Sequence, residues 1–102
     1  MPTQLSSVTV GCLLLDFRLR QARSLKDKRS IVSRLKERIR SRYNASVAEV
    51  DAQDDLRRLV VSCVMVGSDS RQLQSTLDKM RNYVETLYLA ELVRADTRVE
   101  VI

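Results

Sequence analysis

The run of residues 8–19, VTVGCLLLDFRL, constrains the fold most, because it is β-prone and apolar in both phases of a strand's alternation. The two phases are Val8, Val10, Cys12 and Leu14 on one side, and Leu13, Leu15, Phe17 and Leu19 on the other. A strand with two apolar faces belongs at the centre of a sheet or beneath an oligomer contact. We therefore expect the rest of the fold to be built around this strand.

An amphipathic helix follows the first strand. Its apolar stripe recurs at spacings of three and four once Lys28 is included, and consists of Leu25, Val32, Leu35, Ile39 and Tyr43. Ser24 is a good N-cap, and Asp27 suits the first turn, where the helix dipole favours acids. Because Lys28 falls in the stripe, we expect its aliphatic stem to pack and its ammonium group to reach water. The helix is expected to end near Tyr43 and Asn44.

The remaining segments complete the pattern. Residues 44–51 are typical of a short strand, the polar cluster at 51–55 of a turn, and residues 56–67 of a second strand apolar in both phases. The stretch 67–70 ends that strand and caps a second helix, whose apolar stripe is Leu73, Leu77, Met80, Val84 and Leu87. In residues 92–102 apolar and charged side chains alternate, which is typical of an edge strand with one face in water.

The resulting order, β-α-β-β-α-β, predicts an α+β fold of the ferredoxin-like kind, in which two helices cover one face of a four-stranded antiparallel sheet. The expected strand order, 4-1-3-2, places the two most apolar strands in the middle. With 102 residues, two glycines and one proline, the chain has room for one core and shows no linker. Residues 1–102 are therefore expected to form a single domain.

The segment SLKDKR at residues 24–29 resembles the YlxP-like family of small, uncharacterised bacterial proteins. The resemblance continues through residues 43–44, the segment SVAEV at 46–50 and the apolar strand that follows, so it covers almost the whole chain. The chain departs from the family pattern at Tyr43, where phenylalanine is more frequent. It departs again at residues 55–57, where DLR replaces the common Asp-Leu-Trp run.

The resemblance implies a ferredoxin-like fold and a connection with RNA. Genes of family members often lie beside those of translation and ribosome-maturation factors, including ribosome-binding factor A. No activity is established for the family, so the resemblance implies no reaction. An RNA, or the ribosome, is the partner that this association favours.

Positive charge is concentrated in residues 18–42. This segment holds eleven of the 18 basic residues and two of the 13 acids, so its formal charge is +9, whereas the rest of the chain carries −4. On a helical wheel at 100° per residue, the basic side chains form two flanks beside the apolar stripe. One flank is Lys26, Arg29, Lys36 and Arg40, and the other is Arg34, Arg38 and Arg42.

Both flanks stay in water when the helix packs, so their cations can meet phosphates. We therefore predict a nucleic-acid-binding surface formed by Arg29, Arg34, Lys36, Arg38, Arg40 and Arg42. The alternative is a solvated helix face kept basic for solubility. Solubility alone would favour mixed signs, and the scarcity of acids in this segment argues for binding.

The start of the same helix predicts an anion-binding site, formed by Ser24, Lys26, Lys28 and Arg29. The three cations crowd the end of the helix where the dipole already favours anions. Together with the free backbone N–H groups and the Ser24 hydroxyl, they resemble a phosphate site. The alternative is that Asp27 and Glu49 neutralise the cluster.

Other kinds of site find little support. The chain has no histidine and no glycine-rich phosphate loop, so we expect no enzyme activity, cofactor or metal site. Cys12 and Cys63 lie in apolar strand patterns and are expected to be buried, reduced thiols. An RNA-recognition motif stacks bases on aromatics of its central strands, where this chain has only Phe17. The apolar run at 8–15 is too short to cross a membrane, and we expect a cytoplasmic protein.

We therefore predict a small binding protein whose basic helix contacts structured RNA or the ribosome. The alternative is a homodimeric protein–protein interaction module in which the charge is incidental. In this fold one sheet face stays open. The apolar side chains on that face are either Val10, Cys12 and Leu14 or Leu13, Leu15 and Phe17. A homodimer formed through the open sheet face would bury them, unless long side chains such as Arg18 and Arg20 cover them in a monomer.

Overall fold

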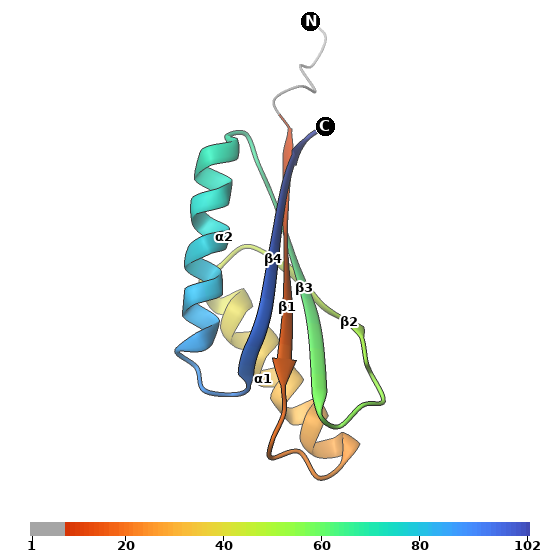
Figure 1. Ribbon diagram of the computed structural model, residues 1–102. Coiled ribbons are helices and arrows are strands. Elements are labelled where there is room, and N and C mark those ends of the chain that lie inside the picture. The colour runs from red at the N-terminus through yellow and green to blue at the C-terminus, as the bar shows by residue number, and fades with distance from the viewer. Residues whose placement is uncertain (1–7) are drawn as a thin grey trace, which may run out of the picture.

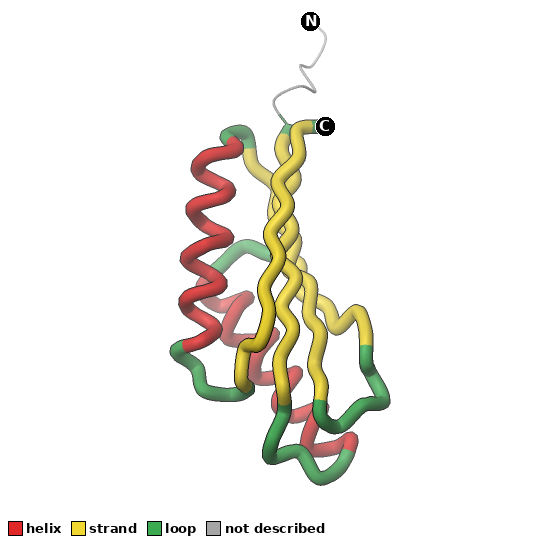
Figure 2. The backbone as a smooth tube through the Cα atoms, viewed as in Figure 1, coloured by secondary structure: helices red, strands yellow, loops and turns green. Residues whose placement is uncertain are grey.

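The computed structural model describes residues 8–102, and its elements follow the predicted order (Figure 1). Strand β1 (Thr9–Arg18) leads into helix α1 (Leu25–Arg42), which is followed by strands β2 (Ser46–Asp51) and β3 (Arg58–Gly67). Helix α2 (Ser70–Glu85) and strand β4 (Glu91–Val101) complete the fold. Short loops and turns connect these elements (Figure 2).

The four strands form one antiparallel sheet in the order β2-β3-β1-β4. The strand β1 lies between β3 and β4, and β3 lies between β2 and β1, so the two strands that are apolar in both phases are the interior ones. The prediction of a ferredoxin-like α+β fold with this strand order is confirmed. β4 is an edge strand, as its alternation of apolar and charged residues predicts.

Both helices lie on the same side of the sheet, and the core lies between the helices and this side (Figure 1). On β1, Leu13, Leu15 and Phe17 point into the core and are at most 1% exposed. The alternate residues of β1 point to the opposite, open face and are only partly buried. The structure thus selects the first of the two apolar sets, Val10, Cys12 and Leu14, as the one on the open face.

Both helices begin with side chains that accept hydrogen bonds from free backbone N–H groups. At α1, the hydroxyl of Ser24 accepts from the N–H of Asp27 at 3.1 Å, and the Asp27 carboxylate accepts from the N–H of Arg23 at 3.0 Å. The helix ends before Tyr43, whose backbone is extended. At α2, the carboxylate of Asp69 accepts from the first-turn N–H groups.

Gly11 of β1 lies against the side chains of α2. A Cβ atom at this position would lie 2.8 Å from a methyl carbon of Leu77 and 3.0 Å from the Cγ atom of Leu73. Both leucines are buried in the core. The absence of a side chain at Gly11 therefore allows α2 to pack directly against the middle of the sheet.

Candidate nucleic-acid interface

The outward side of α1 presents the predicted cations to solvent. We call this set the basic surface of α1: Lys26, Arg29, Arg34, Lys36, Arg38, Arg40 and Arg42. Lys36 is partly buried and the other six side chains are exposed. Within residues 8–102, none of the seven forms an ion pair. The helix therefore carries a positive field that its own neighbourhood does not neutralise.

Arg34 and Arg38 lie on the flank of α1 that faces the loop after α2. They line a shallow groove together with Glu37, Thr86, Leu87 and Leu89. Neither guanidinium has a hydrogen-bond or ion-pair partner among the described residues. Both are therefore free to contact an anionic partner.

Arg42 belongs to the same flank but is held differently. Its guanidinium carbon lies 4.5 Å from the ring centroid of Tyr83, which is a cation–π contact. Tyr83 in turn packs edge-to-face against Tyr43, with ring centroids 5.9 Å apart. Arg42 thus connects the end of α1 to the end of α2 as well as carrying charge.

The opposite flank of α1 faces β2. Arg40 donates a hydrogen bond from Nη2 to the carbonyl oxygen of Val47 at 3.0 Å, which fixes its side chain against the sheet edge. Lys36 lies one turn earlier, beside a shallow depression lined also by Ser33, Glu37 and Ser41. This flank is thus more constrained than the one that carries Arg34 and Arg38.

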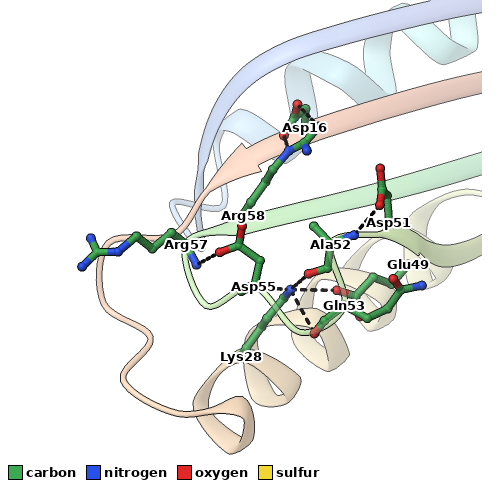
Figure 3. A network of polar contacts seen from close by, with 9 residues as sticks. All are labelled: Asp16, Lys28, Glu49, Asp51, Ala52, Gln53, Asp55, Arg57 and Arg58. Carbon is green, nitrogen blue, oxygen red and sulfur yellow. Dashed lines mark hydrogen bonds and ion pairs between the residues drawn. The ribbon is translucent and has the colours of Figure 1, made fainter.

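Lys28 is where the sequence prediction is wrong. The residue is 2% exposed, and its ammonium group does not reach water (Figure 3). Nζ donates hydrogen bonds to the carbonyl oxygens of Ala52, of Gln53 at 3.3 Å and of Asp55 at 2.7 Å, all in the turn between β2 and β3. An ammonium group has three donors, so these carbonyls use all of them. Lys28 therefore cannot serve an external anion.

Glu49 supplies the charge opposite Lys28. Its Oε2 atom lies 3.1 Å from Nζ, and its side chain is 19% exposed. The same oxygen is buried and has no hydrogen-bond partner of suitable geometry. The contact is thus an ion pair without a directed hydrogen bond, because the carbonyls occupy the ammonium donors. This pair joins SLKDKR on α1 to SVAEV on β2, the two segments that carry the family resemblance.

Two of the four residues predicted to bind an anion at the start of α1 are therefore otherwise engaged. Lys28 is buried, and the hydroxyl of Ser24 caps the helix by accepting from the Asp27 N–H. The Asp27 carboxylate accepts from a backbone N–H group and pairs with no cation among the described residues. Lys26 and Arg29 are exposed, and an anion beside them stays a prediction.

The turn that Lys28 holds also explains why β3 begins at Arg58 rather than at residue 56. Ala52 has a φ of 56°, a left-handed conformation that non-glycine residues seldom adopt. The carboxylate of Asp51 accepts from the Ala52 N–H at 2.7 Å, and that of Asp55 accepts from the Arg57 N–H at 2.8 Å. These side-chain-to-backbone bonds extend the turn beyond its predicted end (Figure 3).

Charged side chains cover one end of the open sheet face. Arg58 donates to both carboxylate oxygens of Asp16, at 3.2 and 3.1 Å, and Arg94 pairs with Asp96 at 3.0 Å. Val60, which is the β3 partner of Asp16, is only 4% exposed. The cover is thus provided by arginines of β3 and β4.

In the alternative to a dimer, long side chains such as Arg18 and Arg20 would cover the open face. Arg20 pairs with Glu91 at 2.9 Å near the start of β4, and Arg18 is exposed at the end of β1. At the far end of the open face, Val66 is 72% exposed, so residues 8–102 leave this end largely uncovered.

Tyr88 is a surface residue that the sequence did not single out. It is 90% exposed and has a φ of 52°, in the loop between α2 and β4. It lines a shallow pocket with Arg18, Arg20 and Leu89, among others. No local signal distinguishes an outward tyrosine in such a loop from one that closes the core. Phe17, by contrast, is 1% exposed and lies beneath the helices, where it cannot stack on a base.

The two cysteines lie on opposite faces of the sheet, and both are free thiols. Cys63 is fully buried, as predicted, and burial raises its pKa to about 12. Cys12 is only partly buried on the open face, with Sγ 3.3 Å from the hydroxyl oxygen of Ser62. Within residues 8–102, no group of His, Cys, Asp and Glu side chains is placed to hold a metal ion.

The fold and the basic surface of α1 together define a small ferredoxin-like protein with one cationic helix. The chain belongs to the family described as "Protein of unknown function (DUF503)", whose model matches residues 10–97. It is 28% identical over 89 residues to the uncharacterized protein YlxP of Bacillus subtilis (strain 168), covering 87% of this chain and 89% of that protein. The resemblance to the YlxP-like family is thus confirmed.

Two solved structures are similar to this one at a low level. The de novo designed protein Ferredog-Diesel matches with a TM-score of 0.45 and 11% identity, over 89% of this chain and 83% of its own. SnoaB, a cofactor-independent oxygenase from Streptomyces nogalater, matches with a TM-score of 0.44 and 7% identity, over 94% and 93%. Neither likeness bears on function. In the described part of the chain, no helix is long and apolar enough to cross a bilayer.

Proposed function

We propose that this chain binds RNA, free or within the ribosome, through the phosphates that meet the basic surface of α1. The observation that supports it is the set of seven cations on one helix that have no ion-pair partner within residues 8–102. On α2, by comparison, there are only three cations, Arg71, Lys79 and Arg81, and Arg81 is paired with Glu85 at 3.0 Å. Uncompensated cations on one rigid element suit a phosphate backbone.

Recognition of this kind is led by phosphates and carries little sequence preference. An RNA-recognition motif would place aromatic side chains on the sheet for base stacking, and here Phe17 is buried beneath the helices. The family resemblance, with its gene neighbours in ribosome maturation, favours structured ribosomal RNA as the partner. The proposal is one of binding, with no chemical step.

The test is to measure RNA affinity as a function of salt for the parent and for a variant with Arg34→Ala and Arg38→Ala. These two side chains have no protein partner that the change would disturb, whereas Arg42 also packs on Tyr83 and is left in place. The variant should bind more weakly. The slope of log affinity against log salt should become less steep for each phosphate that the variant no longer neutralises. The change in slope should be about 0.7 per phosphate on single-stranded RNA and about 0.9 on duplex.

A variant with Arg57→Ala and Arg71→Ala is the matched control, because it removes the same charge from exposed arginines outside α1. It should keep most of the affinity and nearly the full salt slope. The proposal fails if the parent shows no RNA binding at roughly 50 mM salt, a favourable condition for phosphate binding. It also fails if the control weakens the affinity as much as the α1 variant does.

A second candidate function is a homodimeric interaction module formed through the open sheet face. The observation in its favour is the end of that face which residues 8–102 leave largely uncovered, where Val66 is 72% exposed beside the partly buried Val10 and Val64. Light scattering at micromolar concentration tests it: a homodimer has twice the chain mass of 11.7 kDa. Val66→Asp should return such a dimer to the monomer mass.

A further inference from the structure

The strand β4 has one unpaired edge along its eleven residues. Among residues 8–102 no strand pairs with its outer side, and Figure 1 shows β4 running along the front of the sheet with no helix or loop across it. Such an edge is a template for another strand, and most proteins protect it. The other edge strand, β2, is short, with six residues and a shift in register between Glu49 and Asp51.

We infer that the β4 edge binds the β4 edge of a second copy of this chain, in antiparallel pairing, so that two sheets become one of eight strands. This inference goes beyond RNA binding and does not depend on it. It uses a different surface from the open-face homodimer. The observations that carry it are the charges of β4, their register in the sheet and the regular pairing of residues 95–101 with β1.

The charged side chains of β4 alternate in sign along one face of the strand. These side chains belong to Arg94, Asp96, Arg98 and Glu100, which pair in the sheet with Asp16, Leu14, Cys12 and Val10 of β1. Because these β1 residues lie on the open face, the four charges of β4 lie on it too. A two-fold axis through Thr97 puts Arg94 opposite Glu100 of the second copy, and Asp96 opposite its Arg98. All four charges of each copy then face an opposite charge directly across the junction.

Other registers lack this complementarity. Residues directly opposite each other in an antiparallel pair point to the same face of the sheet. The two-fold axis must therefore pass between two copies of the same residue, and the alternative registers differ only in which residue that is. At Asp96 it would place Arg94 opposite Arg98, and at Arg98 it would place Asp96 opposite Glu100; like charges in direct opposition are destabilising. At Ala95 or Val99 only two of the four charges find an opposite partner.

The side of β4 that faces the helices fits the same register. The axis through Thr97 brings the two copies of Thr97 together and places Ala95 opposite Val99 of the second copy. Thr–Thr pairs are favourable across strands, and the Ala95–Val99 pair sets no charge against an apolar side chain. The irregularity in β4 pairing falls opposite Asp16 and Phe17, near the start of the strand, and residues 95–101 keep a regular register with β1.

The four charged side chains of β4 are also free to pair across the junction between two copies. Arg98 and Glu100 have no ion-pair partner within residues 8–102. Arg94 and Asp96 pair within β4, but their side chains are 73% and 52% exposed, and a surface pair of this kind is weak. Exchanging it for pairs across the junction therefore costs little.

Charge exchange provides the test, with mass measured by light scattering. The parent is expected to have twice the 11.7 kDa chain mass. Asp96→Arg alone places two arginines in opposition, and Arg98→Glu alone places two acids in opposition, so each variant should shift to the monomer mass. An equimolar mixture of the two variants should recover the dimer, because each junction again joins opposite charges. The double variant Asp96→Arg/Arg98→Glu should also be dimeric.

Three results would overturn the inference. One is a parent that stays at monomer mass at its highest soluble concentration. Another is a dimer that survives both single charge reversals but dissociates in Val66→Asp, which would assign self-association to the open face. The third is a mixture of the two reversed variants that remains monomeric. Because positions 96 and 98 are exposed, circular dichroism should show all variants folded.

Discussion

At the scale of single residues, Lys28 shows that a basic helix can contain a cation with a purely structural task. The neighbouring cations of α1 are exposed, whereas Lys28 points into the protein and binds the turn between β2 and β3 (Figure 3). Its position in the apolar stripe was visible in the sequence. The three carbonyl groups that receive it were not, because they lie more than twenty residues away in a turn whose backbone shape depends on the same contact.

We predict that Lys28→Met destabilises the protein by about 3–5 kcal/mol, as measured by urea unfolding, because it leaves the Glu49 carboxylate half-buried without its counter-charge. Glu49→Gln added to the same chain should restore part of the stability, since an amide is less costly to bury than a charge. Arg29→Met, one position along the helix and exposed, is the control and should change stability little. Equal effects of the two single variants would contradict the structural assignment of Lys28.

Cys63 gives a prediction for pH. Burial raises its thiol pKa from 9.0 to about 12, so the folded state keeps the proton that the unfolded state loses. The stabilisation is complete below pH 9.0 and is lost as pH rises from there towards about 12, by at most about 1.4 kcal/mol per pH unit. Unfolding free energies of the parent and Cys63→Ala should therefore converge over this range. A constant difference between them would show that Cys63 does not titrate in this way.

At the scale of elements, the sequence predicted every strand and helix, because their signals are local. Apolar residues in both phases mark β1 and β3 as interior strands, and spacings of three and four mark the helices. The turn after β2 was predicted at residues 51–55, but its extension to residue 57 was not, because Lys28 of a distant segment holds it. The irregularity in β4 and the outward Tyr88 were not predicted either, since they depend on contacts between distant segments. The basic surface of α1 was predicted as a set, but which cations are free required the structure.

The cations of α1 repel one another along the helix. Arg38 lies four residues from both Arg34 and Arg42, and like charges at this spacing cost about 0.2–0.5 kcal/mol per pair at low salt. We therefore predict that Arg38→Ala raises the free energy of unfolding at low salt by about 0.4–1 kcal/mol. The increase should shrink at about 1 M salt, where screening is nearly complete.

Arg81→Ala on α2 is a control of opposite sign, because it removes an attractive pair with Glu85. It should destabilise the protein at low salt and have less effect at high salt. A stabilisation by Arg38→Ala that does not depend on salt would point to helix propensity, and would contradict the assignment of uncompensated charge to α1.

At the scale of the whole molecule, the proposed contacts lie in different places. The helix α1 contacts β2, while α2 contacts β1 and β4, so the basic surface is far from the β4 edge. A two-fold axis at that edge, perpendicular to the sheet, would keep the helices of both copies on one face of the eight-stranded sheet. With α1 against β2, the strand at the outer edge, and strands about 4.8 Å apart, the two α1 helices would be roughly 30 Å apart.

Two basic surfaces on one face would let a dimer hold a long RNA at two points, which raises overall affinity through effective concentration. We therefore predict that Arg98→Glu weakens binding of an RNA longer than the gap of roughly 30 Å more than binding of a short one. The double variant Asp96→Arg/Arg98→Glu has the parent's net charge. It should restore the parent's higher affinity for the long RNA relative to the short one. Arg57→Glu controls for the charge change, and fluorescence anisotropy measures all four proteins. If Arg98→Glu and Arg57→Glu weaken both RNAs equally, then edge pairing makes no contribution to RNA binding.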